Sequence, residues 1–251
     1  MLKKLNLLWQ VPYTIWTGLT YVLSALITVP VYFILSFIGG EKLEQRIATY
    51  NRNWSKIWGS ICGIRVKVID RHKVDKNQSY IFACNHTSNL DTMIFPRSSI
   101  FALRPLAKKE IKKIPVMGYL FDKAGIFVDR SSAESRSESM KAMKNLIDRG
   151  VSVFIFPEGT RNRTDKPLGP FYNGAFRLAI ESGIPIVPVV MTNVRRMMSE
   201  KTIWMKPGKA TVIYHDPIST EGYTMDDVEK LRDKVYQVME ESVIKHSLKS
   251  F

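Results

Sequence analysis

The residue types best suited to chemistry are an imidazole and a carboxylate, His86 and Asp91, in the stretch NHTSNLD that follows a short apolar run. In α/β sheets, ligands collect beyond the carboxyl ends of strands. On a continuous helix this spacing would rotate the two side chains about 140° apart, so they can meet only across a turn. Residues 87–89 (Thr, Ser, Asn) are of types common in turns and at helix starts. We therefore predict that Asp91 accepts the imidazole N–H, while the other ring nitrogen takes a proton from a hydroxyl.

Two nearby residues could instead act as nucleophiles. Cys84 lies two residues before His86 and would share its face of a strand. A buried core role is favoured for this thiol, and a turn or cap role for the Ser88 hydroxyl. Neither Cys62 nor Cys84 sits in a C-x-x-C or zinc-ligand spacing, so we expect free thiols and a reducing compartment.

A second group of polar residues occurs in FPEGTR, residues 156–161, which ends another apolar run. Gly159 permits a close backbone approach, Arg161 can bind phosphate, and Glu158 can orient a hydroxyl or a base. An ordinary loop with solvated charges explains this stretch equally well on its own. Arg130 closes a further apolar run, GIFVDR, and is a weak signal by itself.

The charge balance predicts anionic partners. Lysine and arginine outnumber the acidic residues by 37 to 23, giving a formal net charge of +14. Phosphate groups, acidic lipid surfaces, nucleic acid and acidic proteins all suit such a chain. Nucleic acid is the least favoured because no recognition motif accompanies the charge. The basic run RPLAKKEIKK, residues 104–113, is typical of a solvated helix face that could also contact anionic headgroups.

The N-terminal region is apolar, with 36 uncharged residues from Leu5 to Gly40. One membrane crossing needs about 20 apolar residues, so a single straight span explains this length poorly. We expect two shorter helices in a hairpin within one leaflet, each with a proline near a bend or start. Basic residues flank both ends, which favours placing both on the cytoplasmic side. A single signal-anchor helix and a cleaved secretory signal are the alternatives.

Short apolar runs alternate with helical patterns along the rest of the chain. The expected strands are GIRVKVID (63–70), YIFAC (80–84), SIFAL (99–103), GIFV (125–128), VSVFIF (151–156), IPIVPVV (184–190) and ATVIYH (210–215). Helices are expected at 132–148, at 172–183 and after a Thr224/Asp227 capping box. This predicts an α/β fold with a mixed, largely parallel central sheet flanked by helices. We divide the chain into a membrane-associating helical segment, 1–45, and an α/β domain, 46–251.

Four blocks, taken in order, resemble the glycerolipid acyltransferase family, and most of all its 1-acyl-sn-glycerol-3-phosphate acyltransferases. NHTSNLD is similar to the family's H-x4-D block, GIFVDR to its G-x-x-F-(I/V)-x-R block, FPEGTR to its F-P-E-G-T-R block, and IPIVPV to its proline-bearing apolar block. The residues between His86 and Asp91 differ from those of many members, but the spacing is intact.

The resemblance implies an α/β enzyme that acylates the sn-2 hydroxyl of 1-acyl-sn-glycerol 3-phosphate and forms phosphatidic acid for phospholipid synthesis. His86 would be the general base and Asp91 its orienting partner, in a direct transfer without an acyl-enzyme. The glycerol phosphate would be bound by Arg130, Glu158, Gly159 and Arg161, and the apolar block would form a wall near the acyl chain. The resemblance implies no metal or cofactor beyond the co-substrate, a thioester on acyl carrier protein or coenzyme A.

The implied partners are lysophosphatidic acid, the thioester donor and an anionic membrane surface, without nucleic acid. The implied location is the cell membrane, monotopic or peripheral on its cytoplasmic side. Acylation of glycerol 3-phosphate or of another lysolipid is the nearest alternative. A hydrolase with Cys84 or Ser88 as nucleophile and a non-enzymatic basic lipid-binding protein are more distant ones.

Overall fold

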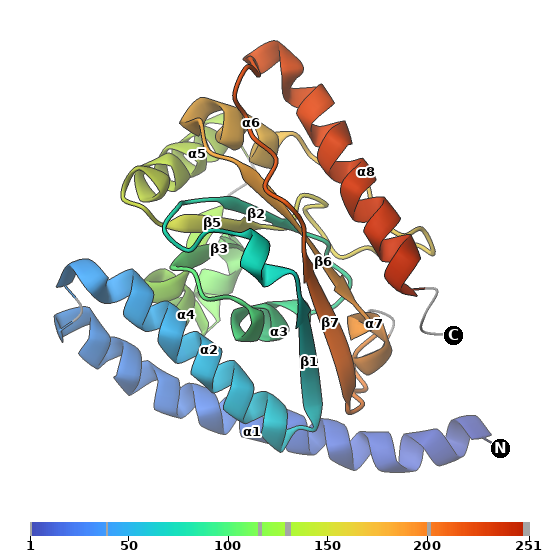
Figure 1. The fold of residues 1–251 in the computed structure, drawn as a ribbon. Coiled ribbons are helices and arrows are strands. Elements are labelled where there is room, and N and C mark those ends of the chain that lie inside the picture. The colour runs from blue at the N-terminus through green and yellow to red at the C-terminus, as the bar shows by residue number, and fades with distance from the viewer. Residues whose placement is uncertain (1, 39, 115–116, 129–131, 200–201, 248–251) are drawn as a thin grey trace.

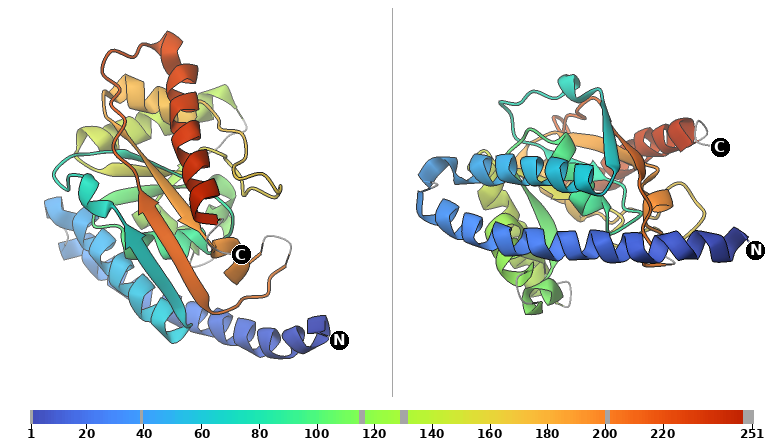
Figure 2. Two further views of the ribbon diagram at one scale, coloured as in Figure 1. Left: turned by 45° about the vertical axis from the view of Figure 1, so that its right-hand side comes forward. Right: turned by 90° about the horizontal axis from the view of Figure 1, so that it is seen from below.

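A central sheet with helices on both faces forms the body of the protein (Figures 1 and 2). The computed structural model describes the chain except residues 1, 39, 115–116, 129–131, 200–201 and 248–251. Within these residues the strands are β1 (Ile64–Ile69), β2 (Ile81–Cys84), β3 (Leu103–Lys108), β4 (Ile126–Val128), β5 (Ser152–Ile155), β6 (Ile186–Thr192) and β7 (Gly208–Tyr214). The α-helices are α1 (Leu2–Ile38), α2 (Leu43–Ile61), α3 (Asp91–Ser98), α4 (Met117–Ala124), α5 (Ala133–Asp148), α6 (Gly174–Ser182), α7 (Val194–Met197) and α8 (Val228–Ser247).

The sheet has the order β1-β7-β6-β2-β5-β3-β4, and only the β6–β7 pair is antiparallel. The predicted mixed, largely parallel sheet is therefore confirmed. β2 and β5 are neighbours, with Ile81 beside Val153 and Ala83 beside Ile155. Because the two strands run in the same direction, the polar stretches that follow them emerge together at one edge of the sheet.

Alternate side chains of the strands enter two separate cores. Ile81 and Ala83 of β2 face the cluster under α5, α6 and α8. Phe82 and Cys84 face the cluster under α2 and α3. Every residue of β6 is buried, so the proline-bearing block is a strand of the core.

Most of the predicted strands are confirmed, but SIFAL is misplaced. The strand begins at Leu103 and continues to Lys108, through half of the basic run that the sequence indicated as a helix face. Arg104 can lie in this strand because Glu44 of α2 neutralises it, through Nε–Oε2 and Nη2–Oε1 contacts of 2.9 and 2.6 Å. The rest of the run forms a short 3-10 helix, Lys109–Lys113.

The helices predicted in the α/β part of the chain, residues 46–251, are confirmed. Ser132 caps α5 by accepting a hydrogen bond from the backbone of Ser135. Gly183 ends α6 with φ of 64°, a left-handed conformation that glycine adopts without strain. The Thr224/Asp227 capping box is present before α8.

The N-terminal apolar helix is confirmed, but its division into two short helices is not found. α1 is a single curved helix of 37 residues that passes through Pro12 and Pro30. A proline removes one backbone donor, and hydroxyls such as that of Thr28, which donates to the Ser24 carbonyl at 2.8 Å, add bonds to the helix backbone. Helix α2 begins beyond the stretch in which the pair was predicted, and it runs back alongside α1 after the 3-10 turn Gly40–Lys42 (Figure 2). The domain boundary at residue 45 stays a prediction.

α1 turns its apolar side outward and its polar side inward. Its exposed large side chains recur at helical spacing and are Leu8, Trp9, Ile15, Trp16, Leu19, Val22, Leu23, Leu26, Ile27, Phe33, Ile34, Phe37 and Ile38. Gln10, Thr17 and Thr28 are buried on the other side. There the Thr28 hydroxyl lies 2.9 Å from that of Tyr50, and Tyr32 donates to Asn51 at 2.5 Å. Such a surface is suited to an apolar environment.

We predict that Glu44→Gln destabilises the protein by about 3 kcal/mol, because Arg104 would be left partly buried without a counter-charge. Denaturant unfolding in detergent, followed by tryptophan fluorescence, measures the change. Lys144→Gln is the matched control, since it removes an exposed pair with Asp148 that contributes about 0.5 kcal/mol. Equal losses in the two variants would contradict the role assigned to the Arg104–Glu44 pair.

Candidate active site

The side chains of His86 and Asp91 meet across the turn between β2 and α3. Nδ1 of His86 lies 2.9 Å from Oδ2 of Asp91. The same carboxylate oxygen accepts the backbone N–H groups of Thr87 and Ser88 at 2.7 and 2.8 Å. Asp91 is fully buried, whereas 15% of the His86 side chain is exposed. The carboxylate thus fixes both the turn and the imidazole, and Nε2 remains the ring nitrogen available for proton transfer.

Phe156 holds the imidazole from the neighbouring strand end. Its ring stacks on that of His86 with centroids 3.9 Å apart and planes 13° apart. Phe156 comes directly after β5, and His86 follows β2 by two residues. The parallel β2–β5 pairing therefore positions the imidazole from two sides, by a hydrogen bond and by a ring contact.

Glu158 links the two strand-end loops from the interior. Its Oε1 accepts the backbone N–H of His86 and its Oε2 accepts that of Gly169, both at 2.8 Å. The residue is 2% exposed. Burial raises the pKa of Glu158, and the two backbone N–H donors act in the opposite direction. A Cβ at Gly169 would lie 2.8 Å from Oε2, so this position requires glycine.

Asn85 attaches the same loop to β6. Its Oδ1 accepts the Met191 N–H at 2.7 Å, and its Nδ2 donates to the Met191 carbonyl at 3.0 Å. Backbone bonding continues on the other side, where Asn162 N–H donates to the His86 carbonyl at 2.7 Å. The loop that carries His86 is therefore bonded to both neighbouring segments.

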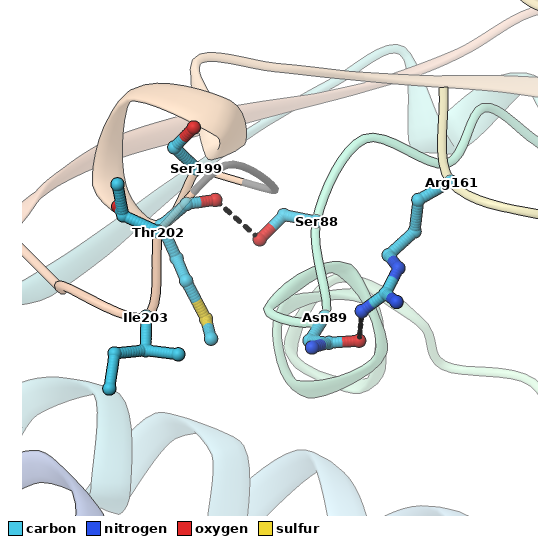
Figure 3. A pocket seen from close by; sticks show the side chains of 7 residues that line it. Ser88, Asn89, Arg161, Ser199, Thr202 and Ile203 are labelled. Atoms are coloured by element: carbon cyan, nitrogen blue, oxygen red, sulfur yellow. Dashed lines mark hydrogen bonds between the residues drawn. The ribbon is translucent and has the colours of Figure 1, made fainter. Parts of the chain in front are cut away.

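Arg161 lines a pocket of about 340 Å³ beside this loop (Figure 3). Its guanidinium donates to the side chain of Asn89. Ser88, Thr202 and Ile203 lie on other walls of the pocket. The segment after α7 rests on α1, since Met205 N–H donates to the Thr14 hydroxyl at 2.9 Å. An arginine in a polar pocket near an apolar helix is suited to a lipid with an anionic headgroup.

The two candidate nucleophiles have structural positions. Cys84 is completely buried in the core under α2 and α3, and burial raises its thiol pKa well above the ordinary value. The Ser88 hydroxyl donates to the Met198 carbonyl at 2.8 Å and accepts from the Leu90 N–H at 3.2 Å. These contacts favour a core role for the thiol and a turn role for the hydroxyl.

The remaining predicted site residues differ in what the structure shows. Gly159 has φ of 66° and closes a turn by donating to the Phe156 carbonyl at 3.0 Å. Arg130 lies outside the described residues. No group of three or more His, Cys, Asp or Glu side chains able to hold a metal occurs among the residues that the structure describes.

Sequence reasoning missed Asn85, Asn89 and Phe156. Asn85 carried a usable signal, because a polar residue directly after a buried strand needs partners for its amide. The stacking of Phe156 depends on which strands are neighbours, and the contact between Asn89 and Arg161 depends on how two loops meet. Neither can be read from the spacing of residues along the chain.

Comparisons with known proteins point to one family. Residues 65–192 match the family model described as "Acyltransferase". The "1-acyl-sn-glycerol-3-phosphate acyltransferase alpha" of Mus musculus is 36% identical over 184 residues, 70% of this chain and 63% of the relative. The "1-acyl-sn-glycerol-3-phosphate acyltransferase" of Saccharomyces cerevisiae is 33% identical over 215 residues, 83% of this chain and 70% of the relative. The chain thus aligns with less than two thirds of the mouse protein's length.

A solved structure shares the fold over almost the whole chain. The crystal structure of the "1-acyl-sn-glycerophosphate (LPA) acyltransferase, PlsC, from Thermotoga maritima" superposes with a TM-score of 0.82. It covers 98% of each chain at 23% sequence identity. The similarity includes the sheet and the N-terminal helices in one arrangement.

We predict that Glu158 makes the free energy of unfolding depend on pH. Its folded pKa lies above the unfolded value of 4.5. At a pH between these two pKa values, the Glu158 side chain is ionised in the unfolded chain and protonated in the folded protein. Stability from this group therefore falls as pH rises through that interval. Denaturant unfolding at a series of pH values should show this fall in the wild type and not in Glu158→Gln. Glu181→Gln, at an exposed position on α6, is the control and should keep the wild-type profile. The same profile in all three proteins would contradict the prediction.

Proposed function

Because this chain belongs to the acyltransferase family, we propose that it transfers a fatty acyl group from a thioester to the sn-2 hydroxyl of 1-acyl-sn-glycerol 3-phosphate. The product is phosphatidic acid, and phospholipid synthesis is the use that we assign to it. The observation that carries the proposal is the hydrogen bond between His86 and Asp91, next to the pocket that holds Arg161. The names of the relatives at 33% and 36% identity support the acceptor.

His86 acts as the general base in this reaction. Nε2 takes the proton of the acceptor hydroxyl as its oxygen attacks the thioester carbonyl. The new C–O bond forms, the C–S bond breaks, and the departing thiolate receives the proton back from the imidazolium. Asp91 keeps Nδ1 as the hydrogen-bonded nitrogen and stabilises the imidazolium. Proton removal by a positioned base contributes about 10²–10⁴-fold to the rate.

Arg161 binds the acceptor's phosphate in the pocket beside His86. Asn89 orients the guanidinium, and the ion pair with phosphate converts binding energy into the orientation of one hydroxyl toward Nε2. Arg130 is proposed as a second phosphate ligand on the basis of the family resemblance. Gly159 provides the turn that brings Arg161 to this place.

Glu158 contributes to the site by positioning, through the backbone N–H groups that it accepts. Both carboxylate oxygens are already bonded inside the protein. Binding of the glycerol phosphate by Glu158, which the family resemblance implies, stays a prediction. The loss of these two bonds would release the loop that carries His86.

Direct transfer, without an acyl-enzyme, is supported by the positions of Cys84 and Ser88. The thiol is buried and its pKa is raised by that burial, so little thiolate forms. The hydroxyl of Ser88 is bonded on both sides. We propose acyl carrier protein or coenzyme A as the thioester carrier, with no metal and no further cofactor.

The outward apolar side of α1 supports attachment to a membrane. The stretch Leu8–Ile38 is long and apolar enough to cross a bilayer, and 11% of its most apolar window is buried in the protein. α1 also packs along α2 and contacts α4, which places one side of the helix against protein along its length. We therefore propose monotopic insertion in the cytoplasmic leaflet, with α1 lying along the surface.

We predict that His86→Ala lowers kcat at least about 10²-fold with lysophosphatidic acid and an acyl thioester, because the base is lost. Release of free thiol that depends on the acceptor measures the rate. Cys84→Ala is the control and should keep activity, while circular dichroism verifies folding. A folded but inactive Cys84→Ala, or an active His86→Ala, would overturn direct base catalysis. Thiol release that never depends on lysophosphatidic acid would overturn the acceptor, and a panel with glycerol 3-phosphate and other lysolipids would then identify it.

We predict that Leu23→Asp combined with Ile27→Asp weakens vesicle binding, since both side chains are exposed on α1 and a charge there opposes insertion. Sedimentation with anionic vesicles measures the bound fraction. Tyr172→Asp, at an exposed position far along the chain, is the control. Equal binding of all proteins would contradict insertion, and labelling of residue 2 from the non-cytoplasmic side would show that the helix crosses the bilayer.

A further inference from the structure

A second pocket lies against the loop of His86, and its wall does not include Arg161. Its volume is about 450 Å³, and its walls include Asn85 and Thr87, the chain neighbours of His86. The pocket beside Arg161 is instead lined by Ser88 and Asn89. One short loop therefore separates two pockets, and the residue between Asn85 and Thr87 is the proposed base.

The two pockets are bounded by different elements of the fold. Val243 and Ile244 of α8 line the second pocket. Part of the first pocket is lined by the segment that follows α7, and this segment contacts α1. The second pocket is thus bounded by α8, and the first is bounded by the segment that contacts the apolar helix.

The second pocket is cationic. Lys166, Arg195 and Arg196 contribute three positive charges to its wall, and Asp165 contributes one negative charge. Arg195 donates to the Thr164 carbonyl at 2.8 Å and to the Asn162 carbonyl, so its guanidinium is fixed in place. Lys166 is exposed and has no ion pair among the residues that the structure describes. This combination of a fixed guanidinium and an exposed ammonium is suited to phosphate groups.

The rest of the wall is polar or apolar without charge. Thr192 is the last residue of β6 and Asn193 follows it, while Pro167, Met191 and the α8 residues supply apolar surface. A ligand with phosphates at one end and an uncharged chain would find partners for both parts.

We propose that this pocket binds the phosphate-bearing part of the acyl donor, a thioester of the phosphopantetheine type. The inference rests on the proposed acyl transfer, because it assigns the second substrate of that reaction. Two substrates must reach one base, and the pocket nearest the apolar face of α1 suits the lipid acceptor. In the donor, an extended uncharged arm joins the phosphate to the sulfur. The phosphate must therefore bind at a distance from the reacting carbonyl and from His86. A pocket that shares its wall with the neighbours of His86 meets this requirement.

The test compares donors with and without phosphate in charge-reversal variants. Lys166→Glu and Arg196→Glu change the pocket, and Lys234→Glu, an exposed position on α8, makes the same change of charge elsewhere. Initial rates are measured with three thioester donors: acyl-coenzyme A, the acylated form of acyl carrier protein, and acyl-pantetheine, which lacks phosphate. We expect each pocket variant to raise the donor KM about tenfold, equivalent to about 1.4 kcal/mol for one charge-assisted contact. The KM for acyl-pantetheine and for lysophosphatidic acid should stay within about threefold of wild type on the same scale.

The result separates the possible sources of the phosphate. An effect with acyl-coenzyme A alone assigns the pocket to the nucleotide phosphates, and an effect with both carriers assigns it to the phosphate that they share. A rise in the KM for lysophosphatidic acid instead of the donor would overturn the proposal in favour of a lipid headgroup. Equal KM values in all variants, or the same change in Lys234→Glu, would also overturn it.

Direct binding keeps this proposal distinct from the proposed activity. Calorimetry of free coenzyme A with the full chain in nanodiscs should show binding that Lys166→Glu and Arg196→Glu weaken about tenfold. Binding of this kind in a protein without acyl transfer would sustain the pocket and refute the activity. Acyl transfer with binding unchanged in the variants would sustain the activity and refute the pocket.

Discussion

The buried carboxylate of Glu158 constrains the whole end of the sheet at which the proposed chemistry occurs. A carboxylate removed from water needs hydrogen bonds to both oxygens, and the cost of leaving one unmade is several times that of losing a surface contact. Glu158 obtains its bonds from the backbones of His86 and Gly169, in two different loops. If either loop moved away, one oxygen of the Glu158 carboxylate would lose its hydrogen bond. Asp91 repeats this pattern at shorter range by bonding the turn and the imidazole with one oxygen.

The parallel pairing of β2 with β5 makes this constraint possible. It brings the ring of Phe156 against the imidazole of His86, and it brings the carboxylate of Glu158 to the backbone N–H of His86. Hydrogen bonds from Asn85 to β6 fix the other side of the loop. The proposed base is thus held by three consecutive strands of the sheet, and its ring has little freedom to turn. Such preorganisation removes a conformational cost from the transition state.

Sequence reasoning predicted the strands, the capped helices and the meeting of His86 with Asp91, because each leaves a local signal. Alternation marks β1, a serine marks the start of α5, and the spacing of the pair demands a turn. It failed at β3, where Arg104 lies in a strand only because Glu44 approaches from 60 residues earlier. It also divided α1 in two, since a proline in a sequence indicates a break that a long helix can tolerate. Contacts between distant segments decided both cases, and they leave no pattern in the order of residues.

In the proposed membrane-bound enzyme, the outward apolar side of α1 decides how substrate concentration is measured. Polar groups of α1, such as Thr17 and Thr28, are buried against the protein, and the apolar groups stay exposed. An enzyme that this helix holds in a membrane, as proposed, meets acceptor and product by diffusion in a plane. The quantity that governs encounter is then the number of lipid molecules per unit area, and adding inert lipid dilutes the substrate even when the volume of the solution stays the same.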